Sequence, residues 1–245
     1  MDISNEEKLE AAQELLENEE DEKVLELCNQ VIAEEPNNAE AYYLRGEAYY
    51  NLKNYQKAIT DYNKVLRLDE ENYKIVYSYR GDAYFHSDKY TQALKDYSKA
   101  IRLGYESEGI FSNRGLIYGK YLQQYEKAVA DFTRAIKIDP ERPDNYNNRA
   151  LAYSFLGQND KTLEDLSTAI KINPKFDAAY SNRGNVYAGA FQNYKKAISD
   201  FSKAIKLNPN YASLYVWRGN CYEALGDLAK ARADFDTAEK LGYEK

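Results

Sequence analysis

The segment Tyr42-Tyr43-Leu44-Arg45-Gly46-Glu47-Ala48-Tyr49 decides the fold, because its pattern returns along the whole chain. An Arg followed by a small residue recurs every 34 or 35 residues, with an aromatic residue three positions before it and a Tyr four positions after it. The Arg residues that mark this period are Arg45, Arg80, Arg114, Arg149, Arg183 and Arg218. A fixed period of this length is typical of a solenoid, so function is expected on an extended surface rather than in one pocket.

The residues that follow each Arg complete a two-helix pattern. A small residue and then a bulky apolar residue recur downstream, as in Ala58 with Tyr62, and three units close with a Pro that stops the second helix. This order resembles the tetratricopeptide repeat, except that Arg replaces the Leu that usually precedes the Gly. The resemblance implies an all-α, right-handed αα-superhelical solenoid of helical hairpins. The expected units are 5–38, 39–73, 74–107, 108–142, 143–176, 177–211 and 212–245, in a single array over 1–245.

Both ends of the array look different from its middle. The first unit is degenerate, opens with the capping box Ser4-x-x-Glu7, and has Lys8 where the other units have an aromatic residue. The last unit carries Arg232 and Glu239 where the others are apolar. Terminal repeats need polar outer faces because nothing stacks on them. We therefore expect the array to be finished at both ends.

Each Arg of the repeat is matched by an Asp on the second helix of its unit. The expected pairs are Arg45 with Asp61, Arg80 with Asp96, Arg114 with Asp131, Arg149 with Asp165, Arg183 with Asp200, and Arg218 with Asp234. The degenerate first unit has Ala11 and Leu27 there, so both partners are absent together. We interpret the pairs as contacts between helices, within one unit or between neighbours, rather than as a phosphate site.

Composition excludes several functions. There is no apolar run of 18 residues and no basic-then-apolar leader, so neither a membrane span nor a signal peptide is expected. Cys28 and Cys221 fall among core positions, which favours a reducing, cytoplasmic location. One His and no phosphate-binding Gly-rich loop predict no catalytic residues, no metal site and no cofactor. A net charge of −7 disfavours nucleic acid, which leaves RNA binding as a remote alternative.

In arrays of the family that the chain resembles, the first helices line a concave groove. Positions two, five, six, nine, twelve and thirteen of each unit would then be exposed there. A row of amides at position six can hold the backbone of an extended peptide. The alternative interpretation is that Asn is only tolerated there, on a polar face of the helix. The ladder residues are Asn113, Asn148 and Asn182, and the residues beside them are Asn147, Ser181, Asn185 and Asn220.

Aromatic and acidic residues flank this row. Tyr43, Tyr79 and Trp217 are candidate anchors, and Glu47 and Asp82 make the groove acidic. No unit carries Lys at position five, so the clamp for acidic peptide tails is absent. The predicted function is a non-catalytic scaffold that binds an extended, neutral-to-basic protein or peptide segment. The protein itself is expected to be a monomer or a weak homo-oligomer. Assembly through the ends or the convex face is the alternative.

Overall fold

The computed structural model describes residues 3–243, and within them the chain is all-α, with fourteen α-helices, one π-helical turn and no strand. It divides into two compact units, and the boundary in the chain lies between Ile117 and Tyr118. The continuous stacking of all seven repeats stays a prediction.

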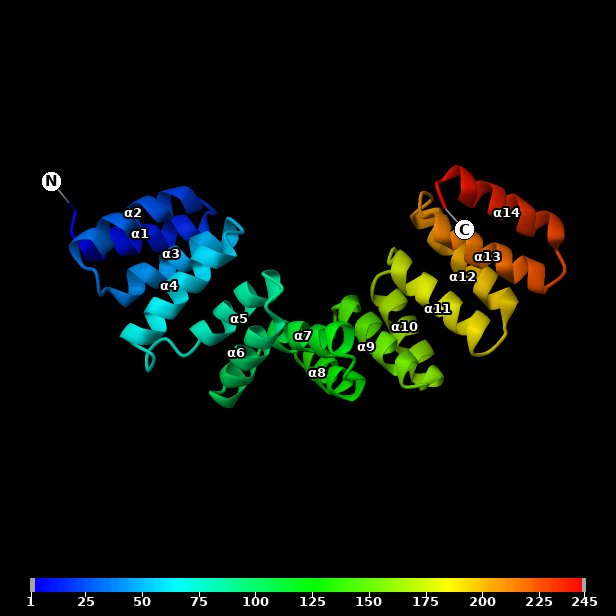
Figure 1. Cartoon of the computed structure of the whole chain (residues 1–245), viewed down its shortest axis with the longest axis horizontal. Helices are drawn as coiled ribbons and strands as arrows, with labels where there is room; N and C mark the ends of the chain where they lie inside the picture. Colours follow the sequence, from blue (N-terminus) through cyan, green and yellow to red (C-terminus); the bar gives the residue numbers. More distant parts are fainter. Residues whose placement is uncertain (1–2, 244–245) are drawn as a thin grey trace. The chain divides into compact units, whose positions relative to one another are not determined.

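Unit one contains three helical hairpins and the first helix of a fourth (Figure 1). Its helices are α1 (Asn5–Glu17), α2 (Asp21–Glu34), α3 (Ala39–Asn51), α4 (Tyr55–Leu68), α5 (Val76–His86), α6 (Tyr90–Arg102) and α7 (Glu108–Leu116). A π-helical turn, Ile117–Tyr121, follows α7. The helices of unit two are α8 (Tyr125–Ile138), α9 (Pro143–Phe155), α10 (Asn159–Ile172), α11 (Asp177–Gly189), α12 (Tyr194–Leu207), α13 (Ala212–Ala224) and α14 (Leu228–Lys240).

Every hairpin turns on one residue in the left-handed region of the backbone. These residues are Glu19, Lys53, Asp88, Gln123, Gly157, Gln192 and Gly226. The next residue closes the turn with a backbone hydrogen bond to the first helix, as when the Asn54 amide donates to the Tyr49 carbonyl at 2.8 Å. In two hairpins the turn closed by this hydrogen bond contains one extra residue. There the Gln124 amide donates to the Tyr118 carbonyl, and the Asn193 amide to the Tyr187 carbonyl, each at 2.7 Å. The insertion is therefore absorbed within the turn.

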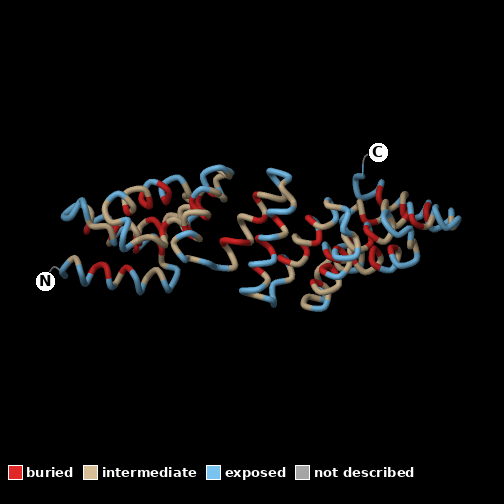
Figure 2. Tube along the Cα trace, turned by 90° about the horizontal axis from the view of Figure 1, so that it is seen from below, coloured by how far each residue is buried: buried red, intermediate tan, exposed pale blue. Residues whose placement is uncertain are grey.

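Small and bulky residues meet where the two helices of a hairpin cross, as the sequence predicts. A Cβ on Gly46 would lie 2.8 Å from the ring of Tyr62, and Gly81, Gly184 and Gly219 are equally close to the aromatic residues facing them. In the repeat that has Ala150 instead of Gly, the facing residue is Leu166, which has no ring. Figure 2 shows the buried residues returning at intervals along each helix, as this packing requires.

Five of the predicted Arg–Asp pairs are present as two-pronged ion pairs within one hairpin. In each, Nε and Nη2 of the Arg donate to the two carboxylate oxygens at 2.6–2.8 Å. The five Asp residues are buried, so these contacts are shielded from water. The sixth pair, Arg114 with Asp131, stays a prediction.

These five arginines, and Arg114 with them, also hold consecutive hairpins together, which the sequence pattern did not reveal. The remaining nitrogen, Nη1, donates to a polar side chain on the second helix of the preceding hairpin. The acceptors are Asn29, Asn63, Ser98, Thr133, Ser167 and Ser202. One guanidinium thus links helices of two repeats, and this explains why Arg replaces the Leu that is usual at this position.

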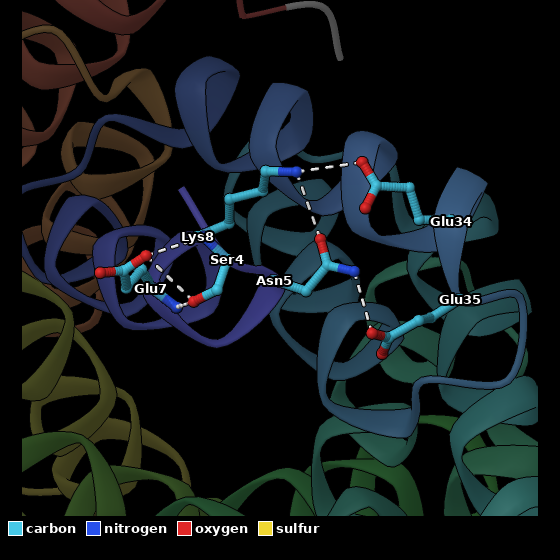
Figure 3. Close-up of polar contacts among 6 residues, drawn as sticks. All are labelled: Ser4, Asn5, Glu7, Lys8, Glu34 and Glu35. Carbon is cyan, nitrogen blue, oxygen red and sulfur yellow. Dashed lines mark hydrogen bonds and ion pairs between the residues drawn. The ribbon is translucent and has the colours of Figure 1, made fainter. Parts of the chain in front are cut away.

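The first hairpin is closed by polar rather than aromatic contacts. Lys8 is buried, and its Nζ donates to Glu34 at the end of α2 at 3.1 Å and to Asn5 at 3.2 Å (Figure 3). Asn5 in turn donates to Glu35 at 2.9 Å, and the capping box of Ser4 and Glu7 is formed as predicted. Arg232 and Glu239 in the last hairpin are exposed, as expected of a terminal repeat.

Candidate functional site: the first-helix face

The first helices of the hairpins form one side of each unit, which we call the first-helix face. It consists of α3, α5 and α7 in unit one and of α9, α11 and α13 in unit two. Unit one has a hollow of about 350 Å³ on this face, and unit two has hollows of about 300 and 290 Å³. Most of the predicted groove residues line one of these three hollows.

The predicted ladder residues differ in how they are held. Nδ2 of Asn182 donates to Oδ1 of Asn147 at 2.9 Å, and Nδ2 of Asn113 donates to Asp82 at 3.0 Å and to the Tyr97 hydroxyl at 3.3 Å. In both cases the preceding first helix orients the amide, and the Oδ1 atom accepts no hydrogen bond from residues 3–243. Asn148 is half-buried, and its side chain makes no hydrogen bond to the described part of the chain.

Asn182 lies between the two hollows of unit two and lines both of them. Asn185 is exposed and lines one hollow, whereas Ser181 and Trp217 line the other. Asn113, Tyr79 and Asp82 line the hollow of unit one. The structure therefore brings predicted residues together within each unit, although Asn148 lies in none of these hollows and Asn220 lines a separate hollow at the end of α13 and α14.

The prediction that position five is exposed is wrong. Ser78, Asn147 and Ser181 are buried, with exposed fractions of 6–7 %. Position five lies at the edge of the apolar stripe, where the neighbouring first helix covers it. Asn147 acts instead as the acceptor that orients Asn182.

The predicted aromatic anchors pack partly on their neighbours. The Trp217 ring lies 6.0 Å from the rings of both Phe201 and Tyr211, measured between centroids, and one of its sides borders a hollow. Tyr43 lies 5.9 Å from Tyr79. These rings are half-buried and therefore held in place, so a ligand would meet a preformed aromatic wall.

The two predicted carboxylates have altered acidity. Burial raises the pKa of Glu47, and a hydrogen bond from Tyr43 acts in the opposite direction. Burial also raises the pKa of Asp82, against the hydrogen bonds from Tyr97 and Asn113. Neither carboxylate forms an ion pair with a Lys or Arg of residues 3–243. The charge of His86 also acts on Asp82 and lowers its pKa.

Several lining residues were not predicted. Tyr105 and Glu106 lie in the segment between α6 and α7, and Tyr211 lies just before α13. Leu151 occupies position nine of its unit, which the prediction named as exposed. The prediction considered only polar and aromatic residues of the first helices and therefore missed residues in the connecting segments. The available signal was a Tyr shortly before a first helix: Tyr105 lies three residues before α7, and Tyr211 directly before α13.

Three further features bear on function: potential metal ligands, the two cysteines and the length of the apolar helices. No group of three or more potential metal ligands occurs among residues 3–243. Both cysteines are buried, and burial raises the pKa of the Cys28 thiol to about 12, so its thiolate is scarce at neutral pH. Of the helices that the structure describes, none is long and apolar enough to cross a bilayer.

Comparison with known proteins agrees with the repeat geometry. Family models of the tetratricopeptide repeat match residues 39–72 and 212–241, and a TPR repeat model matches residues 81–121, 120–154, 156–189 and 192–226. The chain belongs to the tetratricopeptide repeat family. Repeats of this family are generally non-catalytic modules for protein interaction. A search of curated proteins found no match to this tetratricopeptide repeat chain.

Solved structures share the fold. YrrB, titled a TPR protein with an unusual peptide-binding site, is 24 % identical with a TM-score of 0.67, over 76 % of this tetratricopeptide repeat chain and 95 % of YrrB. The C-terminal part of a TPR protein from Cytophaga hutchinsonii is 18 % identical with a TM-score of 0.77, over 96 % and 95 % of the two chains. A Parabacteroides merdae tetratricopeptide repeat protein is 24 % identical with a TM-score of 0.67, over 98 % and 94 %. The predicted fold class is confirmed.

Proposed function

We propose that this tetratricopeptide repeat protein is a non-catalytic scaffold that binds an extended segment of a partner protein on its first-helix face. Membership of the family supports the interaction role. The observation that carries the choice of face is the position of Asn182, between two open hollows and oriented by Asn147. Its Oδ1 atom is available to accept a backbone N–H from a peptide that runs through both hollows.

The chemistry of the face favours a neutral-to-basic segment. Asp82 and Glu47 in unit one form no ion pair with a Lys or Arg of residues 3–243, and burial makes their charge costly. An acidic segment would add to this repulsion, whereas a basic one would relieve it. The amides in unit two carry no charge, so there the ligand would be held by hydrogen bonds and by apolar contact with Trp217.

Replacing Asn148 or Asn182 with Ala tests the amide ladder. Each change removes a hydrogen bond worth on the order of 0.5–1.5 kcal/mol, so peptide binding should weaken by roughly threefold to tenfold per site. The loss should be similar for peptides of different sequence, because backbone contacts carry no side-chain identity. Trp217→Ala should instead change the order of preference among peptides. Isothermal titration with a panel of neutral peptides measures both effects.

Thr168→Ala is the matched control, because Thr168 lies on the second helix α10 and bonds only to the carbonyl of Glu164. It should leave peptide affinity unchanged. Normal binding by an Asn113→Ala, Asn148→Ala, Asn182→Ala triple variant would remove the ladder from the account and place the site on the second helices or at the ends.

A further inference from the structure

The hollow of unit one differs in chemistry from the hollows of unit two. Tyr50, Tyr79 and Tyr105 line it, from α3, α5 and the segment before α7, and Asp82 lies among them. No Lys or Arg lines this hollow. A cavity of about 350 Å³ is large enough for one long side chain together with its peptide backbone.

The carboxylate of Asp82 is only half satisfied. Its Oδ1 accepts hydrogen bonds from the Tyr97 hydroxyl at 2.7 Å and from Nδ2 of Asn113 at 3.0 Å. Its Oδ2 accepts none from residues 3–243, and no Lys or Arg of that range forms an ion pair with it, so His86 is the cation whose charge attraction acts on the carboxylate. The two donors hold Oδ1 in place, so the orientation of the carboxylate is restricted where Asp82 lines the hollow.

The tyrosines supply the second element of recognition. Burial raises the pKa of the Tyr50 hydroxyl to about 12, and the negative charge of the nearby Asp82 contributes to this shift. Tyr79 is held by Tyr43 and Tyr62, with ring centroids 5.9 and 6.3 Å away. Aromatic faces beside a desolvated carboxylate attract a cation through both the ring quadrupole and the charge.

The repeats of the chain provide their own comparison at position nine. In unit one this position holds Gln13, Glu47, Asp82 and Leu116, whereas in unit two it holds Leu151, Asn185 and Asn220. Because the register is the same, the acidic residues are a feature of unit one rather than a requirement of the repeat. The hollow around Asn182 is lined by amides and Trp217, and its one carboxylate, Asp177, already accepts a hydrogen bond from Asn208 at 3.1 Å.

We propose that the hollow of unit one is an anchor pocket for the side chain of a Lys or Arg residue of the partner segment. The ammonium or guanidinium group donates to Oδ2 of Asp82, and its alkyl stem packs between Tyr50 and Tyr79. This anchor rests on the proposed peptide-binding function and assigns the basic part of the ligand to unit one.

The test uses the full chain and the probe peptides Ac-Gly-Ser-Gly-X-Gly-Ser-Gly-NH2, in which X is Lys, Arg, norleucine or Glu. Amide chemical shifts are followed during titration of the isotope-labelled protein. The Lys and Arg peptides should bind about tenfold more tightly than the norleucine peptide, and shifts should centre on α3, α5 and α7. Equal affinity of the Lys and norleucine peptides for the unmodified protein would overturn the anchor without any variant.

Asp82→Asn is the decisive variant. The amide keeps an oxygen for Tyr97 and Asn113, and Asn at the same register is accepted at Asn185 and Asn220. The preference for Lys over norleucine should fall below about threefold, and Tyr50→Leu should reduce it as well. The exposed Asp160→Asn removes the same charge in unit two and should leave the preference intact.

The outcomes separate the anchor from the wider proposal. Loss of the Lys preference in Asp82→Asn, with norleucine binding unchanged, supports the anchor. If the preference for Lys over norleucine survives in Asp82→Asn, the anchor pocket is excluded. The proposed peptide-binding function can still stand in that case, provided that peptides bind and that Asn182→Ala weakens the binding. If no peptide of either kind binds the unmodified chain, the proposed function fails together with the anchor.

Discussion

Replacing Arg149 with Ala is expected to lower the free energy of unfolding by about 3–5 kcal/mol. Arg149 donates to both oxygens of Asp165, at 2.8 and 2.7 Å, and the Asp165 side chain is only 6 % exposed. Without the guanidinium, a buried carboxylate remains with no cation, and the bond to Thr133 in the preceding hairpin is lost too. Urea denaturation followed by circular dichroism measures the change.

The double variant Arg149→Met, Asp165→Leu provides the comparison. It removes both charges and keeps apolar volume, so it should cost much less than Arg149→Ala. The effects of the two single changes on stability should be strongly non-additive, because the two residues form one ion pair. Losses that simply add in the Arg149→Ala, Asp165→Ala double variant would show that the pair contributes no mutual stabilisation.

Replacing Gly46 with Val is expected to destabilise the fold by about 2–3 kcal/mol, through overpacking. A Cβ at this position would lie 2.8 Å from the buried ring of Tyr62, and Val adds two further methyl groups. The ring cannot move away, because Tyr62 is 1 % exposed and packs against the neighbouring helices. Thermal and urea unfolding of the variant measure the loss.

The chain indicates how this loss can be relieved. The two repeats with Ala at this position have no aromatic residue at the facing position: Ala150 is matched by Leu166, and Ala12 by Cys28. Adding Tyr62→Leu to Gly46→Val should therefore cost less than the sum of the two single changes, by a coupling of about 0.5–3 kcal/mol. Strict additivity would mean that the two positions do not compete for the same space.

The sequence predicted the features that depend on period and pairing. The spacing of Arg149 and Asp165 predicted a contact, because it follows from the helical repeat itself. Burial at position five was mispredicted, since Asn147 lies at the edge of the apolar stripe and its exposure depends on how closely the next hairpin packs.

Side-chain partners beyond the repeat pattern could not be predicted. The contact of Arg149 with Thr133 joins residues of different hairpins, and nothing in the spacing distinguishes Thr133 from other polar residues of α8. Tyr105 enters the hollow of unit one from a connecting segment, whose path is set by the ends of α6 and α7. The orientation of the Asn182 amide likewise depends on Asn147 in the preceding repeat.

Selection of peptides from a displayed random library, followed by hydrogen exchange on the full chain with and without a selected peptide, tests the central claim most directly. Exchange reports which backbone amides become protected on binding. The account predicts protection in the first helices α3, α5, α7, α9, α11 and α13, together with weaker binding by Asn182→Ala. Protection confined to the second helices, such as α10 and α12, with unchanged affinity in Asn182→Ala, would contradict binding on the first-helix face.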